Sequence, residues 1–227
     1  MKNLRKQSLE QKLNSIRAGV LGSNDGILTV VGVIFSTAAA SQSSHFVIFI
    51  AALSDLLACC TSMAAGEYAS VSAQKESQKV VVRREKKNIK HKKNYSFFII
   101  SKHYLNLGVE KSTAKKIALT LSKKNELESV VSDKYAFKIG QYIDPWYAAI
   151  SSLFSAALGG LFPLLAIIIL PVSFRIIGTI LFTSVALIIT GILSALIGKG
   201  YIKPALIRNV VIGLITVAIH YGIGKLF

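Results

Sequence analysis

Acidic residues are scarce in this 227-residue chain, and they are almost absent from its apolar stretches. The sequence has 11 Asp and Glu against 27 Lys and Arg, which gives a formal net charge of +16. Only three of these acids, Asp25, Asp55 and Glu67, lie in its five long apolar stretches, and all three lie in the first two. A charge in hydrocarbon costs several kcal/mol, so each of these carboxylates is a candidate functional group.

Cysteine is scarce too, and the common catalytic patterns are missing. Cys59 and Cys60 are adjacent within an apolar stretch, so they cannot form an ordinary structural disulfide with each other. Both can instead serve as small apolar residues that pack between helices. The sequence has no Gly-rich phosphate loop, no zinc-binding spacing and no Ser/His/Asp arrangement. We therefore expect no enzyme activity, no catalytic residues and no cofactor. No two histidines are spaced as a helical ligand pair, and we expect non-ligand roles for His45, His91, His103 and His220.

Apolar residues, in contrast, are abundant and form continuous blocks. They make up 52% of the chain, and the mean hydropathy is +0.52. A helix of about 20 apolar residues crosses a bilayer. Blocks of this length predict membrane-spanning helices at residues 18–40, 46–70, 146–170, 174–197 and 204–226. The expected fold is all-α, a polytopic membrane protein with five transmembrane helices and a helical cytoplasmic insert between the second and the third.

The polar segments divide the chain into four parts. We expect a cytoplasmic N-terminal tail over 1–17, transmembrane helices one and two over 18–70, the insert over 71–145, and helices three to five over 146–227. The insert has apolar positions for about three helices, with Gly108 as a helix stop and Ser112 or Thr113 as a helix cap. No helix breaker lies near residue 70, so the second transmembrane helix can continue into the insert.

The basic residues predict the orientation in the membrane. Seventeen Lys and Arg lie between Lys75 and Lys138 and five lie in the tail, whereas the Ser41–His45 connection has none. The positive-inside rule then places the N-terminus, the insert and the 198–204 loop in the cytoplasm, and the C-terminus outside. We expect a bacterial plasma membrane.

The second apolar stretch carries a series of possible metal ligands. Asp55, Cys59, Met63 and Glu67 follow one another at steps of four, which keeps them near one face of a helix. Carboxylates beside a thioether suit a divalent transition metal, and buried carboxyl groups can also hold protons that the metal displaces. Plainer roles exist for each: core packing for Cys59 and Met63, and a solvated helix end for Glu67. For Asp25, the plainer role is to cap a helix or to form an ion pair with Arg17.

Three classes of function are compatible with this pattern. The leading one is a divalent-metal exporter. The second is a membrane-anchored interaction protein whose basic insert binds anionic lipid or nucleic acid, with lipid headgroups the better match for Lys86, Lys87 and the 90–93 run. We do not favour nucleic acid as a partner. The third, an organic-cation exporter, should have more aromatic residues along its first two transmembrane helices than this chain offers.

Two motifs resemble those of a known family. They are Asn24-Asp25-Gly26 in the first apolar stretch and the run SMAAGEYASVS, from Ser62 to Ser72, at the end of the second. Together with the five apolar stretches and Asp144-Pro145-Trp146 before the third, they are similar to the vacuolar iron transporter family in its bacterial form. The resemblance covers essentially the whole chain, and the second motif is long and specific.

This resemblance implies a function and a set of site residues. Family membership implies a homodimer whose first helices line a shared path, exporting Fe²⁺ or Mn²⁺ from the cytosol in exchange for protons. Asp25 and Met63 match the family's acidic and methionine positions, and Asp55 falls where members often have Glu. Glu67 matches the glutamate of the bacterial Gly-Glu-Tyr sequence. The metal ion is then the transported substrate and not a cofactor.

The insert departs from the family pattern. Members collect metal there with repeated glutamates, but here only Glu85 matches the first such position, and Asn88, Ser96 and Ile99 stand at others. Glu126 and Glu128 align loosely with later ligands. Residues 71–145 contain 17 basic residues against seven acids, a balance that repels a divalent cation. We therefore expect the membrane path to do most of the metal selection.

Overall fold

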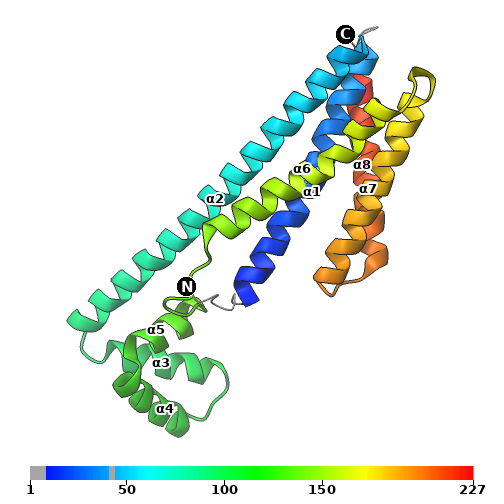
Figure 1. Cartoon of the computed structure of the whole chain (residues 1–227). Helices are drawn as coiled ribbons and strands as arrows, with labels where there is room; N and C mark the ends of the chain where they lie inside the picture. The colour runs from blue at the N-terminus through cyan, green and yellow to red at the C-terminus, as the bar shows by residue number, and fades with distance from the viewer. Residues whose placement is uncertain (1–8, 41–43, 227) are drawn as a thin grey trace, which may run out of the picture. The chain divides into compact units, whose positions relative to one another are not determined.

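The chain is helical throughout the part that the structure describes. The computed structural model (Figure 1) covers residues 9–40 and 44–226, and within them no strand is formed. The helices in these ranges are α1 (Leu9–Ala40), α2 (His45–His91), α3 (Tyr95–Asn106), α4 (Lys111–Lys124), α5 (Glu126–Tyr135), α6 (Pro145–Ile169), α7 (Arg175–Ile197) and α8 (Ile202–Gly224). A short 3-10 turn, Val172–Phe174, lies between α6 and α7. The predicted all-α class is confirmed.

Among the described residues, five helices are long and apolar enough to cross a membrane: α1, α2, α6, α7 and α8. This confirms the predicted number of transmembrane helices. Two of them are longer than the apolar stretches that predicted them. Helix α1 begins at Leu9 rather than at residue 18, because a helix continues into polar sequence when nothing breaks it. Helix α2 has 47 residues, or about 70 Å, so it extends well beyond a bilayer of about 30 Å.

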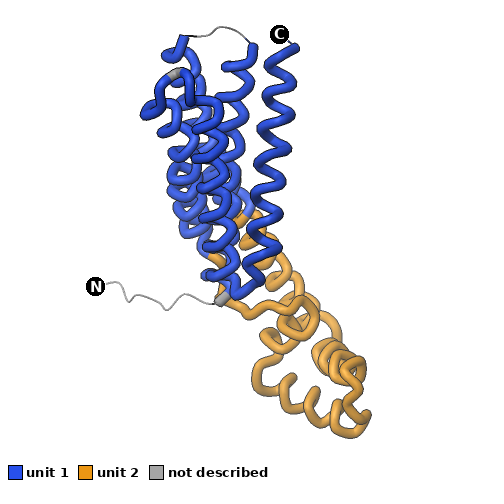
Figure 2. Tube along the Cα trace, turned by 90° about the vertical axis from the view of Figure 1, so that its right-hand side faces the viewer, with its two compact units in different colours: residues 1–70, 144–227 blue, residues 71–143 orange. Residues whose placement is uncertain are grey.

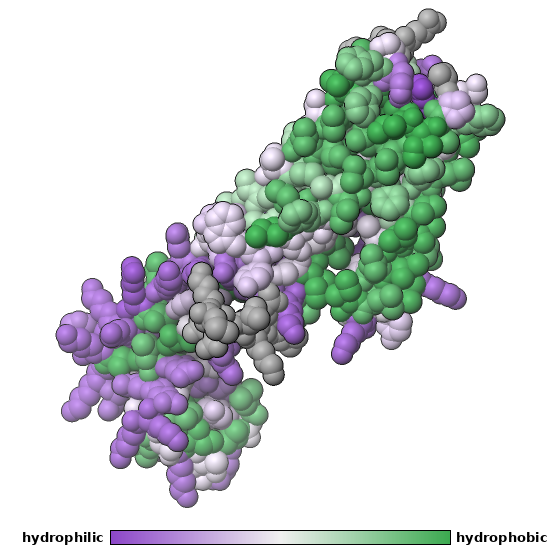
Figure 3. Space-filling model, in the orientation of Figure 1, coloured by the Kyte–Doolittle hydropathy of each residue, from purple (hydrophilic) through white to green (hydrophobic). Residues whose placement is uncertain are grey.

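The chain forms two compact units (Figure 2). The first, here called the membrane unit, comprises residues 1–70 and 144–227. The second, the insert unit, comprises residues 71–143. Apolar side chains dominate the visible surface of the helices of the membrane unit, and hydrophilic ones much of the surface of the insert unit (Figure 3). Helices α7 and α8 leave many large apolar side chains exposed, among them Leu181, Val185, Ile212 and Ile219, as lipid-facing helices do.

Helices α1 and α6 pack with their backbones almost in contact. A Cβ atom added at Gly26 would collide with the carbonyl oxygen of Ala156, and one added at Gly159 would collide with that of Ser23. Small residues permit this approach, which maximises van der Waals contact where lipid offers no hydrophobic driving force. Gly22 and Gly160 lie at the same contact, where an added Cβ would collide with the carbonyl oxygens of Ser152 and Gly26.

Helix α2 covers the other side of this pair through an apolar core. Buried residues of three helices meet there: Val30, Val31, Ile34 and Phe35 of α1, Ala52, Leu56, Cys59 and Cys60 of α2, and Ala156, Leu164 and Ile167 of α6. Both cysteines are free thiols within this core. They fill the small-residue role that their sequence position allows.

The start of α6 is held by a capped turn. Asp144 is the N-cap, its side chain accepts a hydrogen bond from the Trp146 backbone N–H at 3.1 Å, and Pro145 occupies the first helical position. Gln11 of α1 bonds the backbone of Asp144 twice, at 2.6 Å to its N–H and 3.3 Å to its carbonyl oxygen. The first turns of α1 and α6 are therefore tied together.

The insert unit has its own small core. Ile100 of α3, Ala118 of α4 and Val130 of α5 are fully buried against one another. Helix α3 ends before Gly108, whose φ of 83° suits glycine and ends the helix as predicted. The predicted cap of the next helix was wrong. Glu110 is the N-cap residue of α4, and Ser112 donates to its carboxylate at 2.7 Å from inside the first turn.

The close approach of α1 and α6 predicts a strong effect of a single methyl group. We expect Gly159→Ala to lower the free energy of unfolding in detergent micelles by about 1–3 kcal/mol, because the new Cβ must push the two backbones apart. The matched control is Gly222→Ala on α8, where nothing lies within 4 Å of an added Cβ. It should change stability by no more than about 1 kcal/mol. Equal effects of the two substitutions would contradict the packing argument.

Candidate functional site

Asp25 and Cys59 meet at the interface of α1 and α2. The Cys59 thiol donates to the Asp25 carboxylate, with 3.4 Å between Sγ and Oδ2, and Cys59 is only 6% exposed. The possible pairing of Asp25 with Arg17 does not occur, because Arg17 bonds another carboxylate. The structure therefore gives Asp25 a partner inside the membrane unit, one that can also act as a soft metal ligand.

Asp55 lies one helical turn before Cys59 and keeps one oxygen without a partner. Its Oδ2 is buried and accepts no hydrogen bond in the described structure, and the same holds for the Thr29 hydroxyl of α1. Asp55 is close enough to Asp25 for the two charges to interact. Buried polar atoms without partners are rare in folded proteins, and each suggests a missing ion, proton or water. Asp25 of α1 and Asp55 and Cys59 of α2 are thus polar groups of two neighbouring helices.

Met63 and Glu67 continue this face of α2. Met63 packs against the core that α2 shares with α1 and α6, and Glu67 is 6% exposed. On the opposite side of α2, Leu57, Thr61 and Ala65 are exposed. Steps of four from Asp55 to Glu67 therefore do keep these side chains on the packed side of the helix. Their spread along the axis is about 18 Å.

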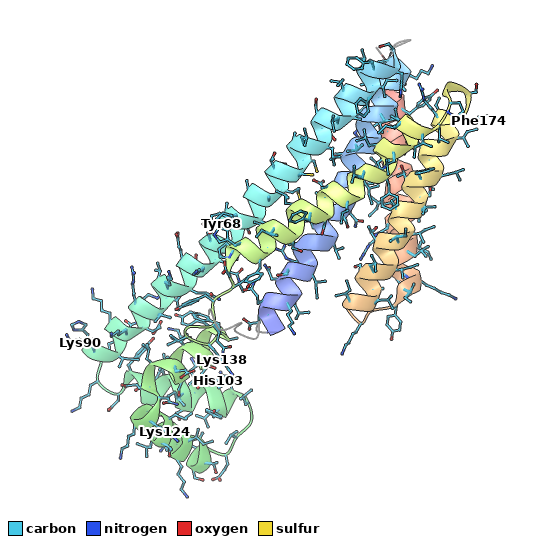
Figure 4. The ribbon with its side chains drawn as sticks, viewed as in Figure 1. Tyr68, Lys90, His103, Lys124, Lys138 and Phe174 are labelled. Atoms are coloured by element: carbon cyan, nitrogen blue, oxygen red, sulfur yellow. The ribbon has the colours of Figure 1, made fainter. Side chains whose placement is uncertain are left out.

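Glu67 is held by an ion pair at one end of this series. Its Oε2 lies 2.9 Å from the Arg17 guanidinium, and the side chains of Glu67 and Arg17 are 7% and 57% exposed. Glu67 is thus not a freely solvated acid at a helix end. Directly after it, the Tyr68 ring (Figure 4) contacts the Trp146 ring of α6, with 4.9 Å between centroids.

The candidate ligands form a series rather than one preformed centre. Within residues 9–40 and 44–226, no three His, Cys, Asp or Glu side chains converge closely enough to hold a metal ion. A row of sites about one or two helical turns apart suits an ion that moves from one to the next. It does not suit a tightly held structural metal, which needs a closed ligand shell.

A polar network beside Asp25 was missed by the sequence analysis. The Asn24 amide oxygen accepts from the Thr190 hydroxyl at 3.2 Å and from the Asn209 amide at 3.4 Å, joining α1 to α7 and α8. Asn209 is 2% exposed. An asparagine inside an apolar stretch was the available signal, since such residues hydrogen-bond across membrane helices. This network orients the helix turn that carries Asp25.

Glu85 lies in the insert unit, and its carboxylate is already surrounded by protein donors. The side chain is fully buried and makes an ion pair with Lys134 at 3.1 Å. Three further donors complete the shell: the hydroxyl groups of Tyr135 at 2.6 Å and Tyr95 at 2.7 Å, and the Asn88 amide at 3.2 Å. A metal bound at Glu85 would have to displace some of these. Its role as a metal ligand stays a prediction.

The other candidate ligands of the insert are dispersed. Glu126 accepts a 2.6 Å hydrogen bond from Ser96, and Glu128 is exposed on α5. Ser96, which stands where the family pattern has a metal-binding residue, is thus in contact with an acid of another helix.

The buried Glu85 predicts a large local stability effect. We expect Glu85→Gln to lower the opening free energy of the insert unit by about 2 kcal/mol or more, because Lys134 loses its ionic partner and several donors lose their acceptor. Hydrogen exchange of the α3 and α5 amides measures this. Glu128→Gln, an exposed acid on α5, is the matched control and should leave protection unchanged.

Glu85 also predicts an acid transition in the insert unit. Burial alone would raise the pKa of Glu85, but the hydrogen bonds from its four partners outweigh burial and lower this pKa from 4.5 to about 2. Because the pKa is lower in the folded state, the carboxylate stabilises the fold above pH 4.5, and this stability is lost as the pH falls toward 2. Exchange protection in Glu85→Gln should lack this dependence. A wild-type loss centred near neutral pH would contradict the assignment.

The chain is similar in sequence to known proteins over most of its length. Residues 16–225 match the sequence profile of the VIT family. A protein named vacuolar iron transporter from Acanthamoeba castellanii is 30% identical over 212 residues, which cover 93% of this chain and 78% of the relative. Vacuolar iron transporter homolog 2.1 of Arabidopsis thaliana is 24% identical over 95% of this chain and 82% of its own length.

A rice relative gives a similar result. Vacuolar iron transporter homolog 1 of Oryza sativa subsp. japonica is 27% identical over 93% of this chain and 73% of the relative. The matched region contains both motifs and the residues of the series on α1 and α2. Because the family profile extends over most of its length, this chain belongs to the VIT family.

Proposed function

We propose that this protein exports Fe²⁺ or Mn²⁺ from the cytosol, in exchange for protons, and so contributes to metal homeostasis. It acts as a transporter and not as an enzyme, in a bacterial plasma membrane. The N-terminus and the insert face the cytoplasm and the C-terminus faces outward, in accordance with the charge distribution. The names of the relatives, all vacuolar iron transporters or their homologs, support iron as a substrate.

The unpartnered carboxylate oxygen of Asp55 is the observation that carries this proposal. A carboxylate with one buried oxygen that accepts no hydrogen bond, beside a second acid on the neighbouring helix, attracts a cation. Asp25, Asp55, Met63 and Glu67 are the proposed ligands along the path, with Cys59 available as a soft donor next to Asp25. Carboxylates with a thioether favour Fe²⁺ and Mn²⁺ over Ca²⁺ and Mg²⁺.

Exchange with protons needs no further chemical group. A carboxyl group in a low-dielectric path can take up a proton when the metal leaves and release it when the next metal arrives. Asp25 and Asp55 are the groups proposed to do this. The coupling is then a competition between H⁺ and the metal for the same oxygens.

A homodimer is supported by the outer face of α2. Exposed residues with small side chains recur there at near-helical spacing: Ser54, Ala58, Ser62, Ala65 and Ala69. Such a face permits a second helix to approach closely in a membrane. We propose that α2 of a second copy packs on it, so that the two copies line a shared path.

The insert unit is proposed to bind anionic lipid headgroups. Its exposed lysines include Lys90, Lys124 and Lys138, which project from the unit in Figure 4. Juxtamembrane basic clusters are attracted to the anionic cytoplasmic leaflet by about 1 kcal/mol per charge. This attraction is compatible with transport and gives the surplus of lysine a role. Nucleic acid is not a proposed partner.

Two neutralised acids test the transport proposal. In proteoliposomes with a pH-sensitive dye inside, we expect wild-type protein to move Mn²⁺ and Fe²⁺ with an opposite pH change. Asp25→Asn and Asp55→Asn should each lower the rate at least about tenfold, because an amide neither carries the charge nor holds the proton.

Glu76→Gln is the matched control for these variants. It makes the same kind of change on the same helix α2, at an exposed position away from the path. Wild-type rates in all three variants would overturn the proposed path. Metal movement without a pH change would remove proton exchange and leave metal transport standing.

A further inference from the structure

Arg17 occupies the carboxylate at the end of the proposed metal path. Its guanidinium lies 2.9 Å from Glu67 Oε2, and no other ion pair of Glu67 is found within residues 9–40 and 44–226. Since Glu67 is 7% exposed at its side chain, this carboxylate needs a compensating positive charge. The Arg17 guanidinium supplies this charge.

The two partners differ in their freedom to move. Glu67 is buried on the packed side of α2, whereas the Arg17 side chain is 57% exposed. Arg17 also contacts the Asn14 amide oxygen at 3.4 Å on its own helix. The guanidinium is thus the more solvent-accessible partner of the pair, and its side chain has room to move away from Glu67.

The helices around this pair are braced independently of it. Gln11 ties the first turn of α1 to Asp144 at the start of α6, with two hydrogen bonds. The ring contact between Tyr68 and Trp146 joins α2 to the same end of α6. The ion pair is thus one of several contacts between these helices, and it lies on the Asp55-to-Glu67 face of α2.

We propose that Arg17 is a tethered counter-ion that a divalent metal must displace to reach Glu67. This inference rests on the proposed transport function and adds a specificity-determining residue to it. A divalent ion replaces the single charge of Arg17 with two charges, so it gains more from the buried carboxylate than a monovalent ion does. Na⁺ and K⁺ cannot displace the guanidinium in this way, because they bring no additional charge to the carboxylate. Arg17 therefore makes the mouth of the path selective for divalent cations.

Removing the competitor should make metal binding easier. In proteoliposomes containing the full chain, we expect Arg17→Gln to lower the Mn²⁺ concentration for half-maximal transport roughly fivefold. Arg17→Lys keeps the charge and should stay within about twofold of wild type. Lys12→Gln, which removes an exposed cation five residues earlier on α1, controls for the general loss of surface charge and should leave this concentration unchanged.

A double variant separates displacement from simple bracing. In the Glu67→Gln background, Arg17→Gln should no longer lower the half-maximal concentration, because the ligand for which the two cations compete is gone. A fall in maximal rate and in thermal stability, without a lower half-maximal concentration, would assign Arg17 a structural role and overturn the inference. So would an equal shift in Lys12→Gln.

Failure of the inference and failure of the proposed function give different results. If wild-type protein moves Mn²⁺ and Arg17→Gln has the wild-type half-maximal concentration, only the displacement of Arg17 is wrong. If neither the wild type nor any variant moves Mn²⁺ or Fe²⁺, the transport proposal falls, and the role of Arg17 falls with it.

Discussion

The membrane unit depends on the close approach of α1 to α6. Gly26 and Gly159 leave no room for a side chain at this contact, because the carbonyl oxygens of Ala156 and Ser23 occupy the space. With α6 packed so closely, α1 is fixed in position and rotation. Its polar residues are then directed to α2 on one side and to α7 and α8 on another. The partners of Asp25, Asn24 and Arg17 all follow from that rotation.

Carboxylate groups have different hydrogen-bond partners in the two units. In the insert unit, Glu85 is surrounded by donors and paired with a lysine, so it stabilises a local fold and offers little to a metal ion. In the membrane unit, Asp55 retains a buried oxygen without a partner. A fully satisfied carboxylate is structural, whereas an unsatisfied one is open to a cation or a proton. This contrast supports the proposal that the metal binds along the membrane helices, although the insert carries more of the chain's acids.

Much of this arrangement could be predicted from residue types. The apolar blocks predicted five helices long enough to cross a membrane, and Gly108 predicted the end of α3. The predictions of helix ends were wrong at two places. Glu110 took the cap position expected of Ser112 or Thr113, and α1 began nine residues before its apolar stretch. Neither choice can be made from composition, because each depends on small differences in backbone hydrogen bonding.

The sequence by itself determined where apolar and acidic residues lie along each helix, and therefore which carboxylates enter the membrane. It placed Asp55, Cys59, Met63 and Glu67 on one face, because helical periodicity is a local property. Only the tertiary structure decided which partner each acid has: Cys59 for Asp25, Arg17 for Glu67, and Lys134 with two tyrosines for Glu85. Apart from Tyr95, which is 10 residues from Glu85, these partners are 34 to 50 residues away along the chain. The rotation and packing of whole helices bring them together, and no local pattern encodes either.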